Sequence, residues 1–254
     1  MESHQSEASQ TSPREAALQA ELAALRAEMQ DFTYTVSHDL RASLRHVVSY
    51  LHLVEEDAGP QLSAEVRGFL QTAVDSAVQM RNLMDGLLEL SRIGTVPLNC
   101  AAVPLVPLLT DLIAARQDAA PGRVIDWQWP AVPAAASVWA DPALLKACLD
   151  HLLGNAVKFT GQRAVAHIAV ALLPVAPGGW QIRIQDDGAG FNPAQAGQLC
   201  RPFQRLHSVR QFPGIGMGLA LSRKIAVRLG GQLAVSAAPD AGCQVLLTLP
   251  AEPA

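Results

Sequence analysis

One histidine of the chain lies in a string of residues that suits phosphoryl chemistry. Residues 32–44 read FTYTVSHDLRASL, with His38 followed by Asp39. A neutral imidazole is a good nucleophile, and a neighbouring carboxylate can fix its tautomer and accept its proton. Because residues i and i+1 of a helix do not face each other, we expect this contact to run along the helix surface or through a shared pocket. An ordinary solvated histidine is the alternative, and the surrounding string favours the chemical role.

A second polar string ends a predicted helix at residues 150–160, which read DHLLGNAVKFT. The amide carbonyl of Asn155 can complete an octahedral Mg²⁺ shell shared with phosphates without adding a repelling anion. Lys158 follows three residues later on the same helical face, where its ammonium group can reach phosphate oxygens. Asn155 could also serve only as a helix C-cap, and the two roles are compatible.

Two glycine-rich strings follow later in the chain. Residues 184–191, IQDDGAGF, come after a predicted strand. There Asp186 can accept a hydrogen bond from the exocyclic amine of adenine, while Gly188 and Gly190 let the backbone approach the base. Residues 212–221, FPGIGMGLAL, form a glycine loop that runs into a helix, whose free N–H groups and positive end can receive phosphates. Each pattern alone is weak, because Asp and Gly also make ordinary turns.

A basic segment lies between the two glycine strings. It reads RPFQRLH at residues 201–207, and Arg201, Arg205 and Arg210 add positive charge there. Long basic side chains are usually solvated surface residues, which is the alternative interpretation of each arginine.

In order and spacing, these strings resemble the motifs of sensor histidine kinases. They are similar to the phosphoacceptor box, the N box, the first glycine box, the F box at the start of a mobile ATP lid, and the second glycine box. The ATP-binding part resembles that of gyrase B, the Hsp90 chaperones and the MutL mismatch-repair proteins. The resemblance covers about residues 14–249. It implies a dimerisation and histidine phosphotransfer hairpin followed by a catalytic domain that binds ATP and Mg²⁺.

The resemblance also implies roles for individual residues. His38 would be phosphorylated by ATP with Asp39 as proton acceptor, and the phosphoryl group would pass to an aspartate in the receiver domain of a response regulator. Asn155 would hold Mg²⁺ shared with the phosphates, with His151 as a second candidate for the metal. The implied ATP-binding residues are Asn155, Lys158, Phe159, Asp186, Gly188, Gly190, Phe203, Arg205, Gly214, Gly216, Gly218 and Leu219.

Four positions depart from the family pattern. Ser43 stands where proline is usual, so we expect a weaker helix bend below His38. His151 replaces a usual asparagine of the Mg²⁺ and phosphate network, and Ile215 replaces a common threonine or serine and removes a hydroxyl donor. Ala42 replaces the threonine or asparagine that many relatives use to position a hydrolytic water, which predicts weak phosphatase activity toward the regulator.

The elements that must position these residues begin with two long helices. Apolar residues from Leu18 onward recur at alternating steps of four and three, which is the seam of a coiled coil, with one irregular step beside His38. A break at Gly59-Pro60 precedes a second periodic run, so we predict an antiparallel helical hairpin over residues 14–96. Two hairpins forming a dimeric four-helix bundle would cover the apolar stripes. An ordinary helical core without a partner is the alternative.

The remaining residues, 97–254, have a mixed pattern that predicts the ATP-binding domain. The expected elements are helices at 104–116, 142–158 and 216–229 and strands at 123–129, 137–139, 164–173, 180–186, 232–237 and 244–249. The fold class is therefore α+β, a helical hairpin followed by an α/β sandwich with a mostly antiparallel sheet. Residues 1–13 are polar and rich in Ser and Gln, and we expect them to be disordered.

Composition limits the partners. The 254 residues carry a net charge of -4, which argues against a nucleic-acid-coating protein. Residues 1–99 carry 7 Arg and 14 Asp plus Glu, whereas residues 100–254 carry 12 Lys plus Arg and 9 acids, so the two parts should meet different partners. Four separated cysteines without a C-x-x-C pair argue against a zinc site or a disulfide framework. The absence of a signal peptide and of a membrane-spanning stretch predicts a cytoplasmic protein with no membrane insertion.

Two other functions stay open at this point. Ser43, His151 and Ile215 motivate a nucleotide-binding scaffold without phosphotransfer, and the superfamily also contains ATPases. Since about a dozen residues precede the coiled coil, we expect the input to come from a separate sensor protein or another partner. Transfer within a subunit or across the homodimer depends on the handedness of the loop at Gly59-Pro60, which composition does not reveal.

Overall fold

The computed structural model describes residues 13–129, 136–176, 178–208 and 211–251. The chain divides into two compact units, with the boundary between Ala77 and Val78. The expectation of disorder falls largely outside the described residues, although Pro13 begins the first helix. None of the helices in the described ranges combines the length and the hydropathy of a bilayer-spanning segment.

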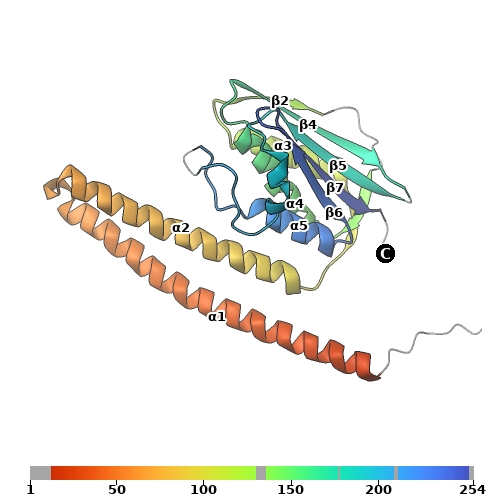
Figure 1. The fold of residues 1–254 in the computed structure, drawn as a ribbon, viewed down its shortest axis with the longest axis horizontal. Coiled ribbons are helices and arrows are strands. Elements are labelled where there is room, and N and C mark those ends of the chain that lie inside the picture. The colour runs from red at the N-terminus through yellow and green to blue at the C-terminus, as the bar shows by residue number, and fades with distance from the viewer. Residues whose placement is uncertain (1–12, 130–135, 177, 209–210, 252–254) are drawn as a thin grey trace, which may run out of the picture. The chain divides into compact units, whose positions relative to one another are not determined.

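The first unit is a helical hairpin. It contains α1 (Pro13–Ala58), the short 3₁₀ helix η1 (Gly59–Gln61) and the beginning of α2 (Ala64–Thr95) (Figure 1). Pro60 lies in the first turn of η1, where its missing N–H costs nothing. The Ser63 hydroxyl then accepts a hydrogen bond from the Val66 N–H at 3.3 Å and caps the start of α2. The predicted helical N-terminal region is confirmed, with its turn at the Gly-Pro break.

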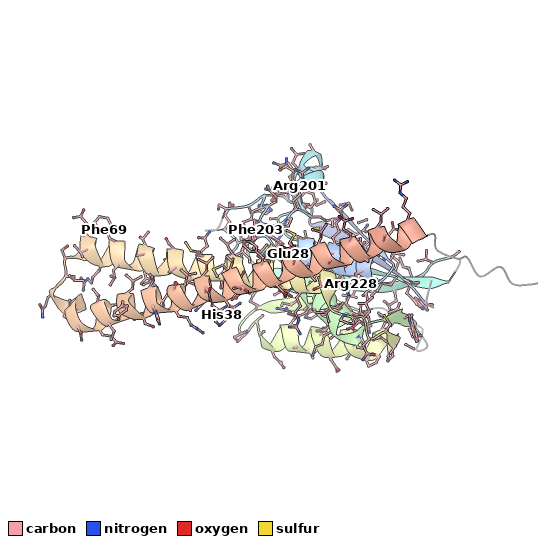
Figure 2. The ribbon with its side chains drawn as sticks, turned by 90° about the horizontal axis from the view of Figure 1, so that it is seen from below. Glu28, His38, Phe69, Arg201, Phe203 and Arg228 are labelled. Carbon is pink, nitrogen blue, oxygen red and sulfur yellow. The ribbon has the colours of Figure 1, made fainter. Side chains whose placement is uncertain are left out.

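Large apolar side chains remain exposed along this hairpin. Met29, Phe32 and Phe69 are 72%, 68% and 65% exposed, and Phe69 projects away from α2 (Figure 2). Among the side chains of this unit that the structure describes, few are buried, and these include Val74 and Ala77. Most of the described apolar side chains that the sequence places on the coiled-coil seam are therefore exposed within one chain. Large exposed apolar patches on a protein surface commonly mark interaction sites.

The second unit is built on a five-stranded sheet in the order β2-β4-β5-β7-β6. Its strands are β2 (Val124–Gln128), β4 (Val165–Pro174), β5 (Gly179–Asp186), β6 (Gln232–Ala237) and β7 (Cys243–Pro250). The β2-β4 pair is parallel and the other three pairs are antiparallel. The expected mostly antiparallel sheet is confirmed.

Three helices cover one face of this sheet (Figure 1). They are α3 (Leu105–Asp118), α4 (Pro142–Phe159) and α5 (Gly218–Arg228). Along β5 the side chains of Ile182 and Ile184 are buried, whereas Arg183 and Gln185 lie on the other face. Ile182 pairs across the sheet with Leu247, which is also buried. This alternation gives the sheet one apolar face for the helices to bury.

The start of α4 follows the predicted Asp-Pro signal. Asp141 Oδ1 accepts hydrogen bonds from the Ala143 and Leu144 N–H groups at 3.0 and 3.1 Å, and Oδ2 accepts one from the Asn99 N–H at 2.9 Å. Burial disfavours the charged carboxylate, but these backbone hydrogen bonds outweigh it and lower the pKa of Asp141. Asp141 is therefore an N-cap that also ties the segment after α2 to the start of α4.

The last turn of α2 is held by α5. Lys224 donates to the Leu90 carbonyl at 2.7 Å, and Arg228 donates to the carbonyls of Ile93 and Val96. Cations at a helix C-terminus satisfy free carbonyls and favour the helix dipole. Because Ile93 is also buried in the core, the C-terminal part of α2 belongs to the second unit.

Some elements differ from the expectations. Strand β1 (Ala101–Pro104), which pairs with β3 (Ser137–Ala140), is not among the predicted strands, and α5 begins at Gly218 rather than at residue 216. The 3₁₀ helix η2 (Pro193–Gln198) is not among the expected elements either. A four-residue strand has too little alternation to be recognised in a sequence, and its existence depends on a partner far along the chain.

Candidate functional site

His38 lies on the exposed surface of α1 (Figure 2). Its Nδ1 atom is 3.3 Å from Oδ1 of Asp39, and the two side chains are 61% and 76% exposed. The contact is direct and runs along the helix surface. An imidazole oriented by a carboxylate through one nitrogen has a defined tautomer. This pair can therefore present a nucleophilic nitrogen to a substrate outside the helix.

Ser43 leaves the helix unbroken next to this pair. Its hydroxyl donates to the Asp39 carbonyl at 3.1 Å, four residues earlier, and α1 is continuous from Pro13 to Ala58. A proline here would remove a backbone N–H and clash with the preceding turn. A serine that bonds back in this way bends a helix only slightly.

The second unit contains a cavity of about 420 Å³. Its walls come from α2, α4, the end of β5, the segment before α5, the start of α5, and β7. Predicted residues that line it are His151, Asn155, Lys158, Phe159, Asp186, Gly190, Arg205, Gly214, Gly216, Gly218 and Leu219. Gly188 and Phe203 are not among the lining residues. A cavity of this size can hold a nucleotide-sized ligand.

Asp186 lines the cavity from the last position of β5. Its Oδ1 atom accepts hydrogen bonds from the Gly188 N–H at 2.9 Å and the Cys243 N–H at 3.3 Å. Burial raises the pKa of Asp186 to about 6, against the effect of these two hydrogen bonds, and the nearby charge of Asp187 adds to the rise. The carboxylate is therefore ionised at neutral pH and can accept a hydrogen bond from an amine in the cavity.

Two glycines of the cavity wall allow a backbone approach that no other residue permits. Gly190 has φ 59°, and a Cβ there would lie 1.9 Å from the Ala238 carbonyl oxygen. Gly216 has φ 76°, and its Cβ would lie 2.5 Å from the Gln204 carbonyl oxygen. Both glycines are needed for conformation and for space.

A second group of residues lining the cavity is suited to phosphates. Lys158 lies with its ammonium group 4.4 Å from the centre of the Phe159 ring, and burial together with the charge of Arg205 lowers its pKa. A Cβ on Gly218, the first residue of α5, would lie 3.3 Å from Nδ2 of Asn155. A cation, a neutral amide and the N-terminus of an eleven-residue helix thus line the same cavity. This combination favours anions.

The residues around Asn155 could hold Mg²⁺ only if a bound ligand supplies part of the coordination shell. The described residues contain no group of three or more His, Cys, Asp or Glu side chains placed to hold a metal. The neutral oxygen of Asn155 lines the cavity, while Nε2 of His151 lies 3.5 Å from Oε1 of Glu89. Mg²⁺ in proteins often takes few protein ligands and completes its shell with phosphates and water. Asn155 fits that role, and His151 is already paired with a carboxylate.

The segment before α5 is held by an arginine and a histidine. Arg205 donates to the carbonyls of Phe212, at 2.6 Å, and of Gly214. Nε2 of His207 lies 2.9 Å from the Gly190 carbonyl oxygen, and its ring centre is 5.1 Å from that of Phe212. His207 was not among the candidate site residues named from the sequence, yet it lines the cavity.

The other residues of this segment lie elsewhere. Arg201 is exposed and does not line the cavity (Figure 2). Phe203 is also exposed and has φ 64°, an uncommon conformation for a bulky side chain. Arg210 falls outside the described residues.

Two known protein families match this chain. The family described as "Histidine kinase-, DNA gyrase B-, and HSP90-like ATPase" matches residues 140–253, which include most of the cavity residues. The "His Kinase A (phospho-acceptor) domain" matches residues 28–96, which include His38. The chain belongs to the histidine kinase family. It is a transmitter core, a phospho-acceptor domain followed by an ATP-binding domain.

Curated phytochromes and sensor proteins resemble this transmitter core over most of its length. Cyanobacterial phytochrome A of Nostoc sp. is 28% identical over 225 residues, which make up 88% of this chain and 29% of the relative. The sensor protein TorS of Escherichia coli is 26% identical over 228 residues, 86% of this chain and 24% of the relative. The chain therefore spans less than a third of the length of these relatives.

Solved structures share the fold. Full-length ShkA in complex with AMPPNP has a TM-score of 0.64 at 24% identity, over 88% of this chain and 46% of that chain. The Acinetobacter baumannii histidine kinase AdeS has a TM-score of 0.56 at 18% identity, over 85% of this chain and 98% of that chain. The transmitter core thus has the fold of solved histidine kinases.

The sequence did not reveal every residue around the cavity of the ATP-binding domain. The wall from α2 consists of Asn82, Asp85, Gly86 and Glu89. Their spacing of three, four and seven places them on one face of a helix, and three polar residues and a glycine at this spacing were the signal that could have found them. The backbone N–H of Cys243 carries no such signal, because any residue but proline can supply it.

Proposed function

We propose that this chain is an ATP-dependent histidine kinase that phosphorylates its own His38 and then passes the phosphoryl group to an aspartate in the receiver domain of a response regulator. The observation that carries the proposal is the cavity, which Asp186 lines together with Asn155 and Lys158, so that one wall holds an acceptor suited to adenine and another holds groups suited to phosphates. The match to the phospho-acceptor family at His38 supports the choice of acceptor.

In this proposal ATP binds with its adenine at Asp186 and its phosphates at Lys158 and the N-terminus of α5. The ionised carboxylate accepts a hydrogen bond from the 6-amino group of adenine. Asn155 would hold Mg²⁺ together with the phosphates, and the bound ion would offset phosphate charge. Lys158 and the backbone N–H groups at Gly218 orient the triphosphate.

The transfer step follows from the tautomer of His38. When Nδ1–H donates to Asp39, the lone pair lies on Nε2, which forms the new bond to the γ-phosphorus. The bond from that phosphorus to the bridging oxygen breaks, and ADP leaves with the electron pair. Asp39 accepts the Nδ1 proton, so the phosphorylated ring ends neutral. Catalysis rests mainly on positioning and electrostatics.

We also propose that residues 14–96 form the phosphotransfer hairpin, that residues 97–254 form the ATP-binding domain, and that two hairpins pair in a four-helix bundle. The exposed apolar side chains of Met29, Phe32 and Phe69 support a homodimer. The exposure of His38 supports access by a receiver domain.

Labelling with γ-labelled ATP and Mg²⁺ tests the kinase against its rivals. We expect acid-labile, base-stable label that disappears in His38→Ala and persists in His46→Ala, an exposed histidine of the same helix. Label that survives in His38→Ala would contradict the mechanism. Tight nucleotide binding without label would favour a scaffold, which the pairing of His151 with Glu89 motivates. Release of free phosphate alone would favour an ATPase.

A further inference from the structure

Arg163 lies outside the cavity, between α4 and β4, and its exposed side chain reaches three backbone carbonyls. Nε donates to the Asp187 carbonyl at 2.8 Å. Nη2 donates to the carbonyls of Gly188 at 3.2 Å and Asp240 at 2.9 Å. A guanidinium can do this because its five N–H groups form a rigid planar fork.

The three carbonyls belong to two turns that both serve Asp186. The turn after β5 contains Asp187 and Gly188, and the Gly188 N–H donates to Oδ1 of Asp186. The turn before β7 begins near Asp240 and ends at Cys243, whose N–H donates to the same oxygen. Arg163 therefore bridges the two sources of the hydrogen bonds that orient this carboxylate.

These turns are tightly packed and depend on being held in place. A Cβ on Gly242 would lie 1.8 Å from the Asp186 carbonyl oxygen, and Asp240 adopts a left-handed conformation with φ 57°. One backbone hydrogen bond, from the Asp240 N–H to the Ala189 carbonyl at 2.8 Å, also joins the turns. A conformation of this kind persists only when its surroundings fix it. The charge-assisted hydrogen bonds of Arg163 add to that support and join the two turns through one side chain.

We propose that Arg163 is a positioning residue for adenine recognition. By holding the two turns together it keeps Oδ1 of Asp186 bonded to both N–H groups, so that the other carboxylate oxygen is directed into the cavity. The inference rests on the proposed function, in which Asp186 accepts a hydrogen bond from the 6-amino group of adenine. Arg163 itself touches neither nucleotide nor His38.

Binding of two diphosphates to the full chain tests this role without phosphoryl transfer. The probes are ADP and purine riboside 5′-diphosphate, which lacks the 6-amino group, measured by calorimetry with Mg²⁺. For Arg163→Gln we expect the affinity for ADP to fall about tenfold, since a hydrogen bond to a charged group is weakened, while the affinity for the analogue changes less than about twofold. Arg163→Lys keeps the charge but lacks the fork, so it should lose most of the discrimination as well.

Arg116→Gln is the matched control. Arg116 also joins two elements, through a hydrogen bond from Nε to Oδ1 of Asp150 at 2.9 Å, but it has no connection to the turns around Asp186. We expect it to leave the ratio of the two affinities unchanged. If Arg163→Gln weakens both ligands equally, its role is merely structural and the proposal is overturned.

The effect of Asp186→Asn separates this inference from the proposed function. If Asp186→Asn keeps the preference for ADP, the adenine role of Asp186 itself is wrong. If Asp186→Asn abolishes the preference and Arg163→Gln and Arg163→Lys both retain it, only the role of Arg163 is wrong. In the double variant, Arg163→Gln should cause no further loss of discrimination, because the two residues act through one carboxylate. If Arg163→Gln does not fold, the ratio of the affinities for ADP and for the analogue is measured on Arg163→Lys instead.

Discussion

Replacing Asp186 by asparagine should stabilise the protein, although Asp186 is proposed to bind the nucleotide. Burial raises its pKa from 3.8 to about 6 in the folded chain. Between pH 3.8 and about pH 6 the folded protein therefore binds more protons at this carboxyl than the unfolded chain does. The free energy of unfolding falls as the pH rises through this range and stays low above it. Asparagine has nearly the same shape without the charge, and its carbonyl can still accept from Gly188 and Cys243.

The size of the effect follows from the same two pKa values. At about 1.36 kcal/mol for each pKa unit, the ionised carboxylate costs about 3 kcal/mol at pH 8 and roughly half as much at pH 5, where protonation in the folded state is nearly complete. Asp186→Asn should therefore raise the free energy of unfolding by up to about 3 kcal/mol at pH 8 and by roughly half of that at pH 5. Stability given up at a ligand site in this way is common in proteins.

Urea unfolding without nucleotide, followed by tryptophan fluorescence, measures this difference. All four tryptophans lie between residues 127 and 180, so the signal reports the ATP-binding domain. Asp111→Asn, which removes an exposed carboxylate from α3, is the control and should give no pH-dependent gain. If Asp186→Asn does not raise the free energy of unfolding at pH 8, or raises it no more there than at pH 5, burial does not destabilise the ionised carboxylate and the reasoning is refuted.

Perturbing other contacts of the chain should have equally specific results. Nucleotide affinity should be about tenfold weaker at pH 5 than at pH 8, because about nine tenths of Asp186 is protonated at pH 5 in the free protein; calorimetry showing equal affinities would contradict this. Lys158→Met should weaken the binding of ATP more than the binding of adenosine in the same assay, since the Lys158 ammonium group is proposed to bind the phosphates. An equal loss of affinity for both ligands would contradict that role. Asp141→Ala should lower the unfolding free energy by about 1–2 kcal/mol at pH 7. Because the pKa of Asp141 is lowered in the folded state, this stabilisation is present above about pH 4 and should disappear in urea titrations as the pH falls below it; a cost that persists there would show that the charge is unimportant. Phe32→Glu should dissociate the proposed dimer in sedimentation experiments, whereas Glu28→Gln should not; a monomeric parent protein would contradict the bundle.

The helices and their ends were largely predictable because their signals are local. The Gly59-Pro60 break and the Asp141-Pro142 cap each depend on a few consecutive residues, and the structure has a turn and a helix start at these places. The strands of the large sheet were found from alternation, which records burial of one face. Strand β1 was missed because its four residues are defined by their pairing with β3 rather than by a pattern of their own.

The candidate site divides in the same way. His38, Asn155, Lys158 and Asp186 could be named from the sequence, since each lies in a string whose residue types suit one chemical task. The contribution of His207 to the cavity wall could not be named, because its partner at Gly190 is distant in sequence and close only in the fold.

The order of the parts and the chemistry that each part carries could be derived from the sequence, since helix periodicity, caps and motif strings are properties of neighbouring residues. The tertiary structure alone decided which backbone groups hold Asp186, that Arg163 bridges the two turns supplying them, and that a polar face of α2 closes the cavity. These features arise where segments far apart in the chain meet, and backbone N–H and carbonyl groups, which every residue but proline carries in full, leave no mark in the sequence.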